Sequence, residues 1–456
     1  MEMSSKLFGT SGIRGLVNVE LTPSLAMRVG AALASQFSGG VIAVGRDTRT
    51  SGEMLESAIA SGIVSCGIDV KTVGVVPTPV LAYLTRELGA EAGVVISASH
   101  NPPQYNGIKV FDSTGMAYTE ERQQLLEESV ERGNFKLPAW DAIGNVEAVD
   151  ARQTYIDGLS DRIQFERRWR VACDLFNGAT CSIAPAMFRK MDCRATLIDA
   201  QPDGRFPAGD PEPTQRSLQR LGRVVVESGS EIGFGFDGDG DRMMAVDERG
   251  EVPTPDRVMA AYAGHVVEGN GGGVIVTHVG ASMCLDEAVQ RAGGSVVRTK
   301  VGDVNIAEAI KGHAAVFGGE PAGAWIHPDV HLCPDGILSA LRLMQALEEE
   351  GKTLTEFIGQ VPDFTILNVK VDCPNSRKAA VMDSIQMSYM EFVDNVSSVS
   401  TVDGIRLDLG YGWILLRPSG TEPVIRITAE ARDAEVARAL IERGRKLVNK
   451  SLEGSA

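Results

Sequence analysis

The sequence predicts an α/β protein made of several similar domains, and two observations lead to this prediction. The chain has 456 residues, which exceeds one ordinary domain and suggests roughly three or four. A strand–loop–helix–strand pattern also occurs three times at domain-sized intervals, with first strands near Ile42, Val171 and Val274. Such units are typical of a mostly parallel sheet covered by helices, so we expect three related α/β domains with mixed or parallel sheets.

Each repeated unit begins and ends with a short apolar run. In the first unit, Ser51 is suited to cap the helix and Gly67 to end it. The first unit is predicted to contain the strand 41–44, the helix 51–66 and the strand 70–76. The second contains the strand 170–174, a helix ending at Met191 and the strand 195–198. The third contains the strand 273–277, a helix ending at Ala292 and the strand 295–297.

The last part of the chain follows a different pattern, which predicts a smaller α+β domain. Alternating apolar residues at 366–371 predict a strand, and a helix over 379–392, two strands around 404–416 and a last helix from Ala434 follow. Polar, proline-containing stretches at 133–145 and 252–255 are candidate boundaries. The domains that we expect are 1–145, 146–253, 254–362 and 363–456.

Composition excludes several classes of partner. Lys and Arg total 44 and Asp and Glu total 60, a formal charge of −16, which argues against a nucleic acid or an anionic membrane. A local arginine cluster can still bind an anionic small molecule. The seven cysteines have no C-x-x-C spacing and are typical of reduced, buried thiols in a cytoplasmic protein. No apolar signal region or membrane-spanning run is found.

A serine-containing loop is the first candidate site. The apolar run 94–96 predicts a buried strand, and two prolines at 102–103 place the intervening residues on a loop at its end. Ligands bind at that end of a parallel sheet. Ser99 is a potential nucleophile with His100 beside it, and Lys109 follows on the next apolar run. An ordinary polar turn is the alternative.

Three alternating carboxylates form the second candidate site. Asp237, Asp239 and Asp241 are separated by two glycines after a strand-like run, and such crowding is unfavourable unless a cation offsets it. Oxygen ligands near phosphate chemistry favour Mg²⁺. No helix follows to support a dinucleotide site, and Arg242 stands where an EF-hand loop needs glycine. A solvated acidic turn stays open as the alternative.

Three further loops combine glycine with polar groups. Residues 8–15 include Arg14, and this loop either contacts phosphate or is a loose terminus. Residues 318–325 include Glu320 and Trp325, and this loop either binds sugar or is a plain turn with a core tryptophan. Residues 299–303 show a similar but weaker pattern. The strongest anion cradle joins Arg417, Ser419, Gly420, Thr421 and Arg426, with a hairpin turn as its alternative.

Four of these loops, in this order, resemble the α-D-phosphohexomutase superfamily, which includes phosphoglucomutase, phosphomannomutase and phosphoglucosamine mutase. The matching segments are 97–102, 237–242, 319–325 and 417–423. The resemblance covers the whole chain and implies three similar α/β domains and a smaller, movable C-terminal domain around a central cleft. It also implies a reaction in which hexose 6-phosphate and hexose 1-phosphate interconvert through a phosphoserine and a bisphosphate, with hexose 1,6-bisphosphate as activator.

The resemblance assigns a role to each candidate residue. Ser99 would be phosphorylated, and its phosphate would join Asp237, Asp239 and Asp241 around one Mg²⁺. The reaction centre would be lined by Arg14, His100, Lys109 and Arg242, with Lys109 transferring a proton. Glu320 would contact sugar hydroxyls. The phosphate that does not react would be held by Arg417, Ser419, Gly420, Thr421 and Arg426.

The sugar loop, residues 319–325, departs from the resemblance. Ala322 and Ala324 stand where many members have Ser and His. Trp325 and the following Ile-His-Pro resemble an archaeal branch associated with phosphoglucosamine mutase, which favours glucosamine phosphate over glucose or mannose phosphate. An aspartyl phosphatase and a non-catalytic phosphosugar-binding protein are the rival hypotheses. The sequence leaves the oligomeric state open, a homodimer included.

Overall fold

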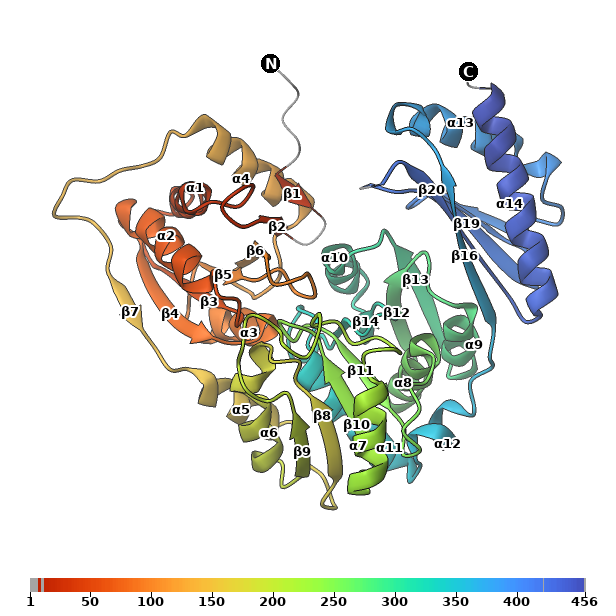
Figure 1. The fold of residues 1–456 in the computed structure, drawn as a ribbon, viewed down its shortest axis with the longest axis horizontal. Helices are drawn as coiled ribbons and strands as arrows, with labels where there is room; N and C mark the ends of the chain where they lie inside the picture. The colour runs from red at the N-terminus through yellow and green to blue at the C-terminus, as the bar shows by residue number, and fades with distance from the viewer. Residues whose placement is uncertain (1–6, 10–11, 421, 455–456) are drawn as a thin grey trace. The chain divides into compact units, whose positions relative to one another are not determined.

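The computed structural model describes residues 7–9, 12–420 and 422–454 (Figure 1). The chain divides into two compact units, and each is described by itself. The first comprises Met1–Val258 and Gly302–Ile358; the second comprises Met259–Val301 and Gly359–Ala456. Among the described helices, none combines the length and apolar character that a membrane span requires. The seven cysteines are free thiols, and all but Cys66 are buried, as the sequence predicts.

A seven-stranded mixed sheet opens the first unit. Its strands are, in spatial order, β1 (Phe8–Gly9), β2 (Gly12–Leu16), β6 (Tyr105–Asp112), β5 (Ala92–Ile96), β3 (Val41–Arg46), β4 (Asp69–Val75) and β7 (Val146–Ala148). Strands β5, β3, β4 and β7 are parallel, whereas β1, β2, β6 and β5 are joined by antiparallel pairs. Strand β7 lies beyond residue 145, so this sheet extends past the end of the first predicted domain.

Four helices pack with this sheet, and the short sequence signals account for their ends. They are α1 (Pro23–Ala34), α2 (Gly52–Ser65), α3 (Thr78–Glu87) and α4 (Glu120–Arg132). Thr22 caps α1 by accepting from the Leu25 N–H at 3.2 Å. Helix α2 ends before Gly67, whose φ of 80° suits glycine. The predicted cap Ser51 makes no capping bond; its hydroxyl instead accepts from Asn106 Nδ2 at 2.9 Å.

A second mixed sheet follows in the same unit. Its order is β11 (Met243–Val246), β10 (Ile232–Phe236), β8 (Arg170–Asp174) and β9 (Arg194–Ile198), with only β11 antiparallel to its neighbour. The accompanying helices are α5 (Arg152–Ser160), the 3₁₀ helix η1 (Ala179–Ser182), α6 (Ala184–Lys190) and α7 (Gln219–Ser228). The single helix predicted before Met191 is therefore two, because Pro185 lacks the N–H that would continue η1 into α6.

Asp174 ends β8 and is 2% exposed. Burial, partly opposed by the Phe176 N–H and reinforced by the Asp199 carboxylate, raises the pKa of Asp174 to about 7, compared with about 4 in an unfolded chain. The folded protein therefore binds this proton more tightly than the unfolded chain. The stability that Asp174 contributes is complete below pH ~4 and is lost as the pH rises through ~7.

Asp174→Asn is expected to remove this pH dependence. At pH 8 the free energy of unfolding should rise by about 1–3 kcal/mol relative to the natural protein, with little change at pH 4. Urea unfolding curves of both proteins from pH 4 to pH 8 measure the difference. Asp161→Asn, at an exposed position of the same domain, is the matched control. If the free energies of unfolding of the Asp174 variant and the natural protein changed with pH in the same way, the prediction would be contradicted.

The remainder of the first unit carries a short antiparallel pair and three helices. The pair is β14 (Phe317–Gly319) with β15 (Trp325–Ile326), and the helices are α10 (Asp303–His313), α11 (Gly336–Glu350) and α12 (Leu354–Ile358). Helix α8 (Pro255–Gly269) runs from the first unit into the second.

The second unit contains the third repeat and the C-terminal sheet. The parallel strands β12 (Gly273–His278) and β13 (Gly294–Thr299) are connected by α9 (Met283–Arg291). An antiparallel sheet follows in the order β16 (Thr365–Asp372), β20 (Val424–Ala431), β19 (Gly412–Pro418), β18 (Ile405–Asp408) and β17 (Ser398–Ser400). Helix α14 (Ala434–Gly454) lies along β16, β19 and β20 (Figure 1), and α13 (Lys378–Ser388) packs against α14.

The three strand–loop–helix–strand units predicted from the sequence are confirmed, and their strands pair in parallel as β3 with β4, β8 with β9 and β12 with β13. The α+β character of the C-terminal part is confirmed as well. Buried Glu430 connects the two parts of the second unit, because its carboxylate accepts from Trp413 Nε1, Ser282 Oγ and the Met283 N–H.

Candidate active site

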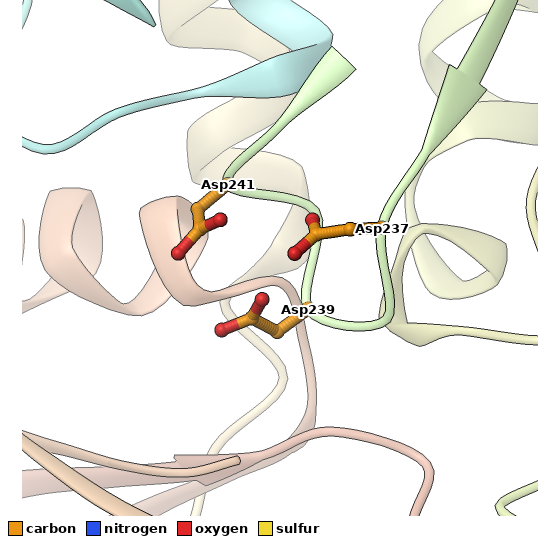
Figure 2. Close-up of side chains that lie close together, drawn as sticks. All are labelled: Asp237, Asp239 and Asp241. Atoms are coloured by element: carbon orange, nitrogen blue, oxygen red, sulfur yellow. The ribbon is translucent and has the colours of Figure 1, made fainter. Parts of the chain in front are cut away.

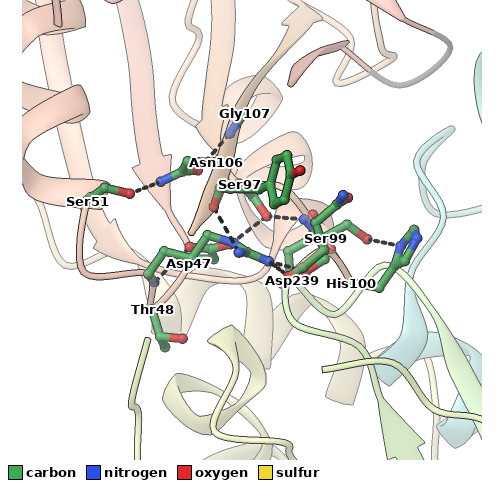
Figure 3. Close-up of polar contacts among 12 residues, drawn as sticks. Asp47, Thr48, Ser51, Ser97, Ser99, His100, Asn106, Gly107 and Asp239 are labelled. Carbon is green, nitrogen blue, oxygen red and sulfur yellow. Dashed lines mark hydrogen bonds and ion pairs between the residues drawn. The ribbon is translucent and has the colours of Figure 1, made fainter. Parts of the chain in front are cut away.

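The serine loop, residues 97–103, begins where β5 ends, as predicted. Ser99 is buried and its φ is 51°, in the left-handed region that is costly for a residue with a side chain. Its N–H donates to Ser97 Oγ at 2.9 Å, and its carbonyl accepts from the Arg49 guanidinium at 2.8 Å. Figure 3 shows these contacts around the loop. The surrounding structure thus holds Ser99 in a strained conformation, which is typical of functional sites.

The Ser99 hydroxyl contacts both groups that the sequence places near it. It donates to Asp237 Oδ2 at 2.6 Å. It also lies 3.3 Å from His100 Nδ1, a contact that Figure 3 shows. The first contact joins residues 138 positions apart in the chain. An ordinary polar turn bonds its own backbone, so these contacts favour the interpretation as an active site.

The acidic loop follows β10 and brings its three carboxylates together. One oxygen of each of Asp237, Asp239 and Asp241 lies within 4.8 Å of the others, and all three residues are buried. Figure 2 shows the side chains converging from the loop. A Cβ on Gly238 would lie 2.5 Å from the Ser99 carbonyl oxygen, so the close approach of the two loops requires glycine. Burial excludes the solvated acidic turn.

Lys109 is the cation that balances these carboxylates. Its Nζ, on β6, lies 2.7 Å from Asp239 Oδ2 and 2.7 Å from Asp241 Oδ2. Thr78, at the start of α3, donates its hydroxyl to the same Asp239 oxygen at 2.5 Å. The lysine predicted to transfer a proton therefore bridges two of the three acids.

Burial and ion pairing separate the protonation states of this cluster. Burial, reinforced by the carboxylates of Asp241 and Asp239, raises the pKa of Asp237 well above its ordinary value. Burial acts in the same direction on Asp239, but the Lys109 ammonium outweighs it and lowers the pKa of Asp239. Burial disfavours the charged form of Lys109, yet its two carboxylate partners raise its pKa. Lys109 is therefore an ammonium at neutral pH.

The acidic loop fits a divalent cation. Oδ1 of Asp239 and Oδ1 of Asp241 are buried and have no hydrogen-bond partner among the described residues. Buried acceptors of this kind are costly unless they are satisfied. Three clustered carboxylates offer the hard oxygen ligands that Mg²⁺ prefers. The predicted ligand set therefore has both the chemistry and the unused oxygens that a magnesium ion needs.

Two guanidiniums and a neutral imidazole complete this centre. Arg14 on β2 donates to Asn101 Oδ1 of the serine loop at 2.8 Å, and Arg242 Nε lies 3.9 Å from Asp241 Oδ1. Burial, together with the charges of Arg242 and Arg14, lowers the pKa of His100 to about 4. His100 is therefore neutral at neutral pH. The structure brings together all four predicted residues of the reaction centre.

The sugar loop connects β14 to β15 and belongs to the same unit. Half-buried Glu320 accepts from the Gly302 N–H at 2.9 Å. Trp325 is 2% exposed and packs edge-on against Phe317, with ring centroids 5.5 Å apart. Of the two alternatives that the sequence leaves open for this loop, the structure therefore shows the core tryptophan.

The phosphate loop lies in the second unit, between β19 and β20. Register places Arg417 directly opposite Arg426, where two like charges are unfavourable without an anion. Arg417 pairs with Asp403 at 2.9 Å and Arg426 with Glu422 at 2.8 Å. Both guanidiniums are half-buried.

The tip of this loop is only partly described. Ser419 is buried and its hydroxyl accepts from the Glu422 N–H at 3.1 Å, while Gly420 is exposed. Thr421, and residues 10 and 11 of the N-terminal loop, lie outside the described residues.

Sequence reasoning missed the residues that support the serine loop from behind. Arg49 is 1% exposed and donates to the carbonyls of Ser99, Asn101, Pro102 and Tyr105. Asp47 accepts from Arg49 Nε at 3.0 Å and from Ser97 Oγ at 2.7 Å. The available signal was the charged run that follows the buried strand β3, at the same sheet edge as the serine loop.

A buried serine hydroxyl held against carboxylates, with an ammonium between two of them, is an arrangement suited to phosphoryl transfer. The chain belongs to the phosphoglucomutase/phosphomannomutase family, because the family's four domains match it in order. The alpha/beta/alpha domains I, II and III match residues 5–137, 153–250 and 254–364, and the C-terminal domain matches residues 368–447. The resemblance and the four-domain α/β fold predicted from the sequence are thus confirmed.

Individual relatives match almost the whole chain. The probable phosphoglucosamine mutase of Methanopyrus kandleri is 43% identical over 450 residues, which are 98% of this chain and 99% of that protein. The phosphoglucosamine mutase of Methanococcus vannielii is 41% identical over 452 residues, with the same two shares. Among solved structures, a phosphoglucomutase/phosphomannomutase family protein from Burkholderia thailandensis gives a TM-score of 0.90 at 27% identity, covering 100% of this chain and 99% of that chain.

Proposed function

We propose that this protein is a phosphohexomutase that interconverts glucosamine 6-phosphate and glucosamine 1-phosphate. The observation that carries the proposal is the 2.6 Å hydrogen bond from Ser99 Oγ to Asp237, within the carboxylate cluster that Lys109 bridges. The names of archaeal relatives at 43% and 41% identity support glucosamine as the sugar. Glucose and mannose phosphates are the alternative substrates.

The reaction moves one phosphoryl group and one proton at a time. The bond between phosphorus and Ser99 Oγ breaks while a bond to a sugar hydroxyl oxygen forms. We assign the proton that Ser99 Oγ gains to the Lys109 ammonium. The proton that the sugar hydroxyl loses restores that ammonium, so the step balances. The sugar 1,6-bisphosphate then turns around, and its other phosphate returns to Ser99. A hexose 1,6-bisphosphate would also phosphorylate Ser99 at the outset and thereby activate the enzyme.

The remaining site residues position the substrate and balance its charge. Arg14, Arg242 and neutral His100 surround the reacting serine, and positive charge there stabilises the phosphoryl oxygens. Asp237, Asp239 and Asp241, with an oxygen of phosphorylated Ser99, would hold Mg²⁺. When bound, the ion offsets negative charge on the transferring group. We further propose that Glu320 contacts sugar hydroxyls and that the phosphate loop, residues 417–423, binds the phosphate that does not react.

Phosphorus NMR tests the proposal directly. The protein is incubated with Mg²⁺ and a trace of hexose 1,6-bisphosphate, and glucosamine, glucose or mannose 6-phosphate is added separately. Growth of a 1-phosphate resonance, fastest with glucosamine 6-phosphate and abolished by a chelator, is the expected result. Release of inorganic phosphate alone would indicate a phosphatase instead of a mutase. No change with any of the sugars would favour a non-catalytic binding protein.

A further inference from the structure

Asp303, the first residue of α10, is a second carboxylate beside the sugar loop. The preceding residue, Gly302, donates its N–H to Glu320 Oε1 at 2.9 Å, which ties the start of α10 to the loop. Asp303 and Glu320 are both half-buried, so a bound molecule can reach them. The structure thus joins the residue before Asp303 to Glu320, and the Glu320 charge acts on Asp303.

The charges that act on Asp303 are those of the reaction centre. They are the charges of Lys109, Asp241, Glu320 and Arg242. The Asp303 charge in turn contributes to raising the pKa of Lys109. The Glu320 charge contributes to raising the pKa of Arg242. Asp303 therefore belongs electrostatically to the place where the sugar would react, although it lies about 200 residues from the nucleophile in sequence.

The sugar loop itself offers little polar chemistry at two of its positions. Ala322 is exposed and Ala324 is 5% exposed, and neither side chain can form a hydrogen bond. Recognition of the sugar must then depend more strongly on neighbouring groups.

We infer that Asp303 acts with Glu320 to recognise the protonated amino group of an aminosugar phosphate, which makes Asp303 a specificity-determining residue. The inference rests on the proposed mutase function. A carboxylate accepts a hydrogen bond from a hydroxyl or an ammonium, but only the ammonium adds attraction between opposite charges. Two neighbouring carboxylates repel each other, and a substrate ammonium relieves that repulsion whereas a glucose or mannose hydroxyl does not.

The test compares kcat/KM for glucosamine 6-phosphate and for glucose 6-phosphate in the natural protein and in Asp303→Asn. The ratio of kcat/KM for glucosamine 6-phosphate to kcat/KM for glucose 6-phosphate should fall by about 10- to 100-fold in the variant, which is the effect of losing one hydrogen bond to a charged group. The value of kcat/KM for glucose 6-phosphate itself should change by less than about threefold. Glu308→Gln, at an exposed position of α10, is the matched control and should keep the natural ratio.

Equal losses with both sugars would give Asp303 a structural role and overturn the inference. A natural protein that turns over glucose 6-phosphate as fast as glucosamine 6-phosphate would overturn it too, with mutase function intact. Absence of any 1-phosphate product would instead overturn the proposed function. Titration calorimetry on the natural protein needs no variant: glucosamine 6-phosphate should bind at least about tenfold more tightly than glucose 6-phosphate, and equal affinities would refute the role of the carboxylates.

Discussion

Ser99→Ala is expected to reduce the rate of sugar-phosphate isomerisation by at least about 10⁴-fold, because removal of a nucleophile that forms a covalent intermediate leaves only binding and electrostatic effects. The same variant should take up no label from a hexose 1,6-bisphosphate that carries radioactive phosphorus. Both results follow from the position of Ser99 Oγ, which is 2.6 Å from Asp237. Turnover and protein labelling are measured on the same samples.

The matched control is Ser113→Ala, at an exposed position in the turn after β6. It should keep the labelling and the rate of the natural protein, because that hydroxyl lies on the surface. A Ser99 variant that still incorporates phosphorus, or that isomerises within about tenfold of the natural rate, would place the phosphoenzyme at another residue. A circular-dichroism spectrum unchanged from the natural protein shows that the loss is chemical.

Local patterns predicted much of this structure because its chemistry is concentrated in short loops. The acids at 237, 239 and 241 and the serine at 99 each stand directly after a buried apolar strand, so sequence alone locates them at sheet edges. Their convergence could not be predicted in the same way, because β5 and β10 belong to different sheets, and the contact between Ser99 and Asp237 joins residues 138 positions apart. The order of four such loops along the chain then predicted the four-domain fold of the whole protein.

The residues that sequence did not reveal act over long separations. Thr78 orients Asp239 from 161 residues away, and nothing in the local Pro-Thr-Pro pattern shows that contact. Ser51 has the residue type and position of a helix cap, but its hydroxyl accepts a hydrogen bond from the Asn106 amide and makes no capping bond. Asp303 is the last residue of the weakest of the predicted loops, and only the contact between Gly302 and Glu320 ties it to the sugar loop. In each case tertiary contact, which no local pattern encodes, decides the role of the side chain.

Arg49→Ala is expected to lower the free energy of unfolding by about 3–5 kcal/mol, because it breaks a buried ion pair and leaves the partner charge uncompensated. The Arg49 guanidinium lies within a shell of carbonyl oxygens and 3.0 Å from Asp47 Oδ2. It also stacks over the Phe206 ring at 5.1 Å. Urea unfolding measured by circular dichroism gives the change in free energy.

Arg49→Lys separates the geometry of this residue from its charge. A lysine ammonium is a point charge with three donors, so it cannot reproduce the planar fork that reaches several carbonyls at once. The serine loop should then lose its fixed conformation at Ser99, and kcat should fall by about 10²-fold, since a misplaced nucleophile of this kind costs about that much. The fraction of enzyme that accepts labelled phosphate measures the same loss independently.

Arg46→Lys provides the matched control, since Arg46 has the same side chain three residues earlier and pairs with exposed Glu53 and half-buried Glu56 instead of backbone carbonyls. A lysine at this position keeps a positive charge beside the same carboxylates and leaves the serine loop untouched, so kcat should stay close to the natural value. If the Arg49 and Arg46 variants behaved alike, the carbonyl contacts of Arg49 would be incidental to catalysis. The strain at Ser99, with φ of 51°, would then have to be held by the Ser97 hydroxyl and the loop prolines alone.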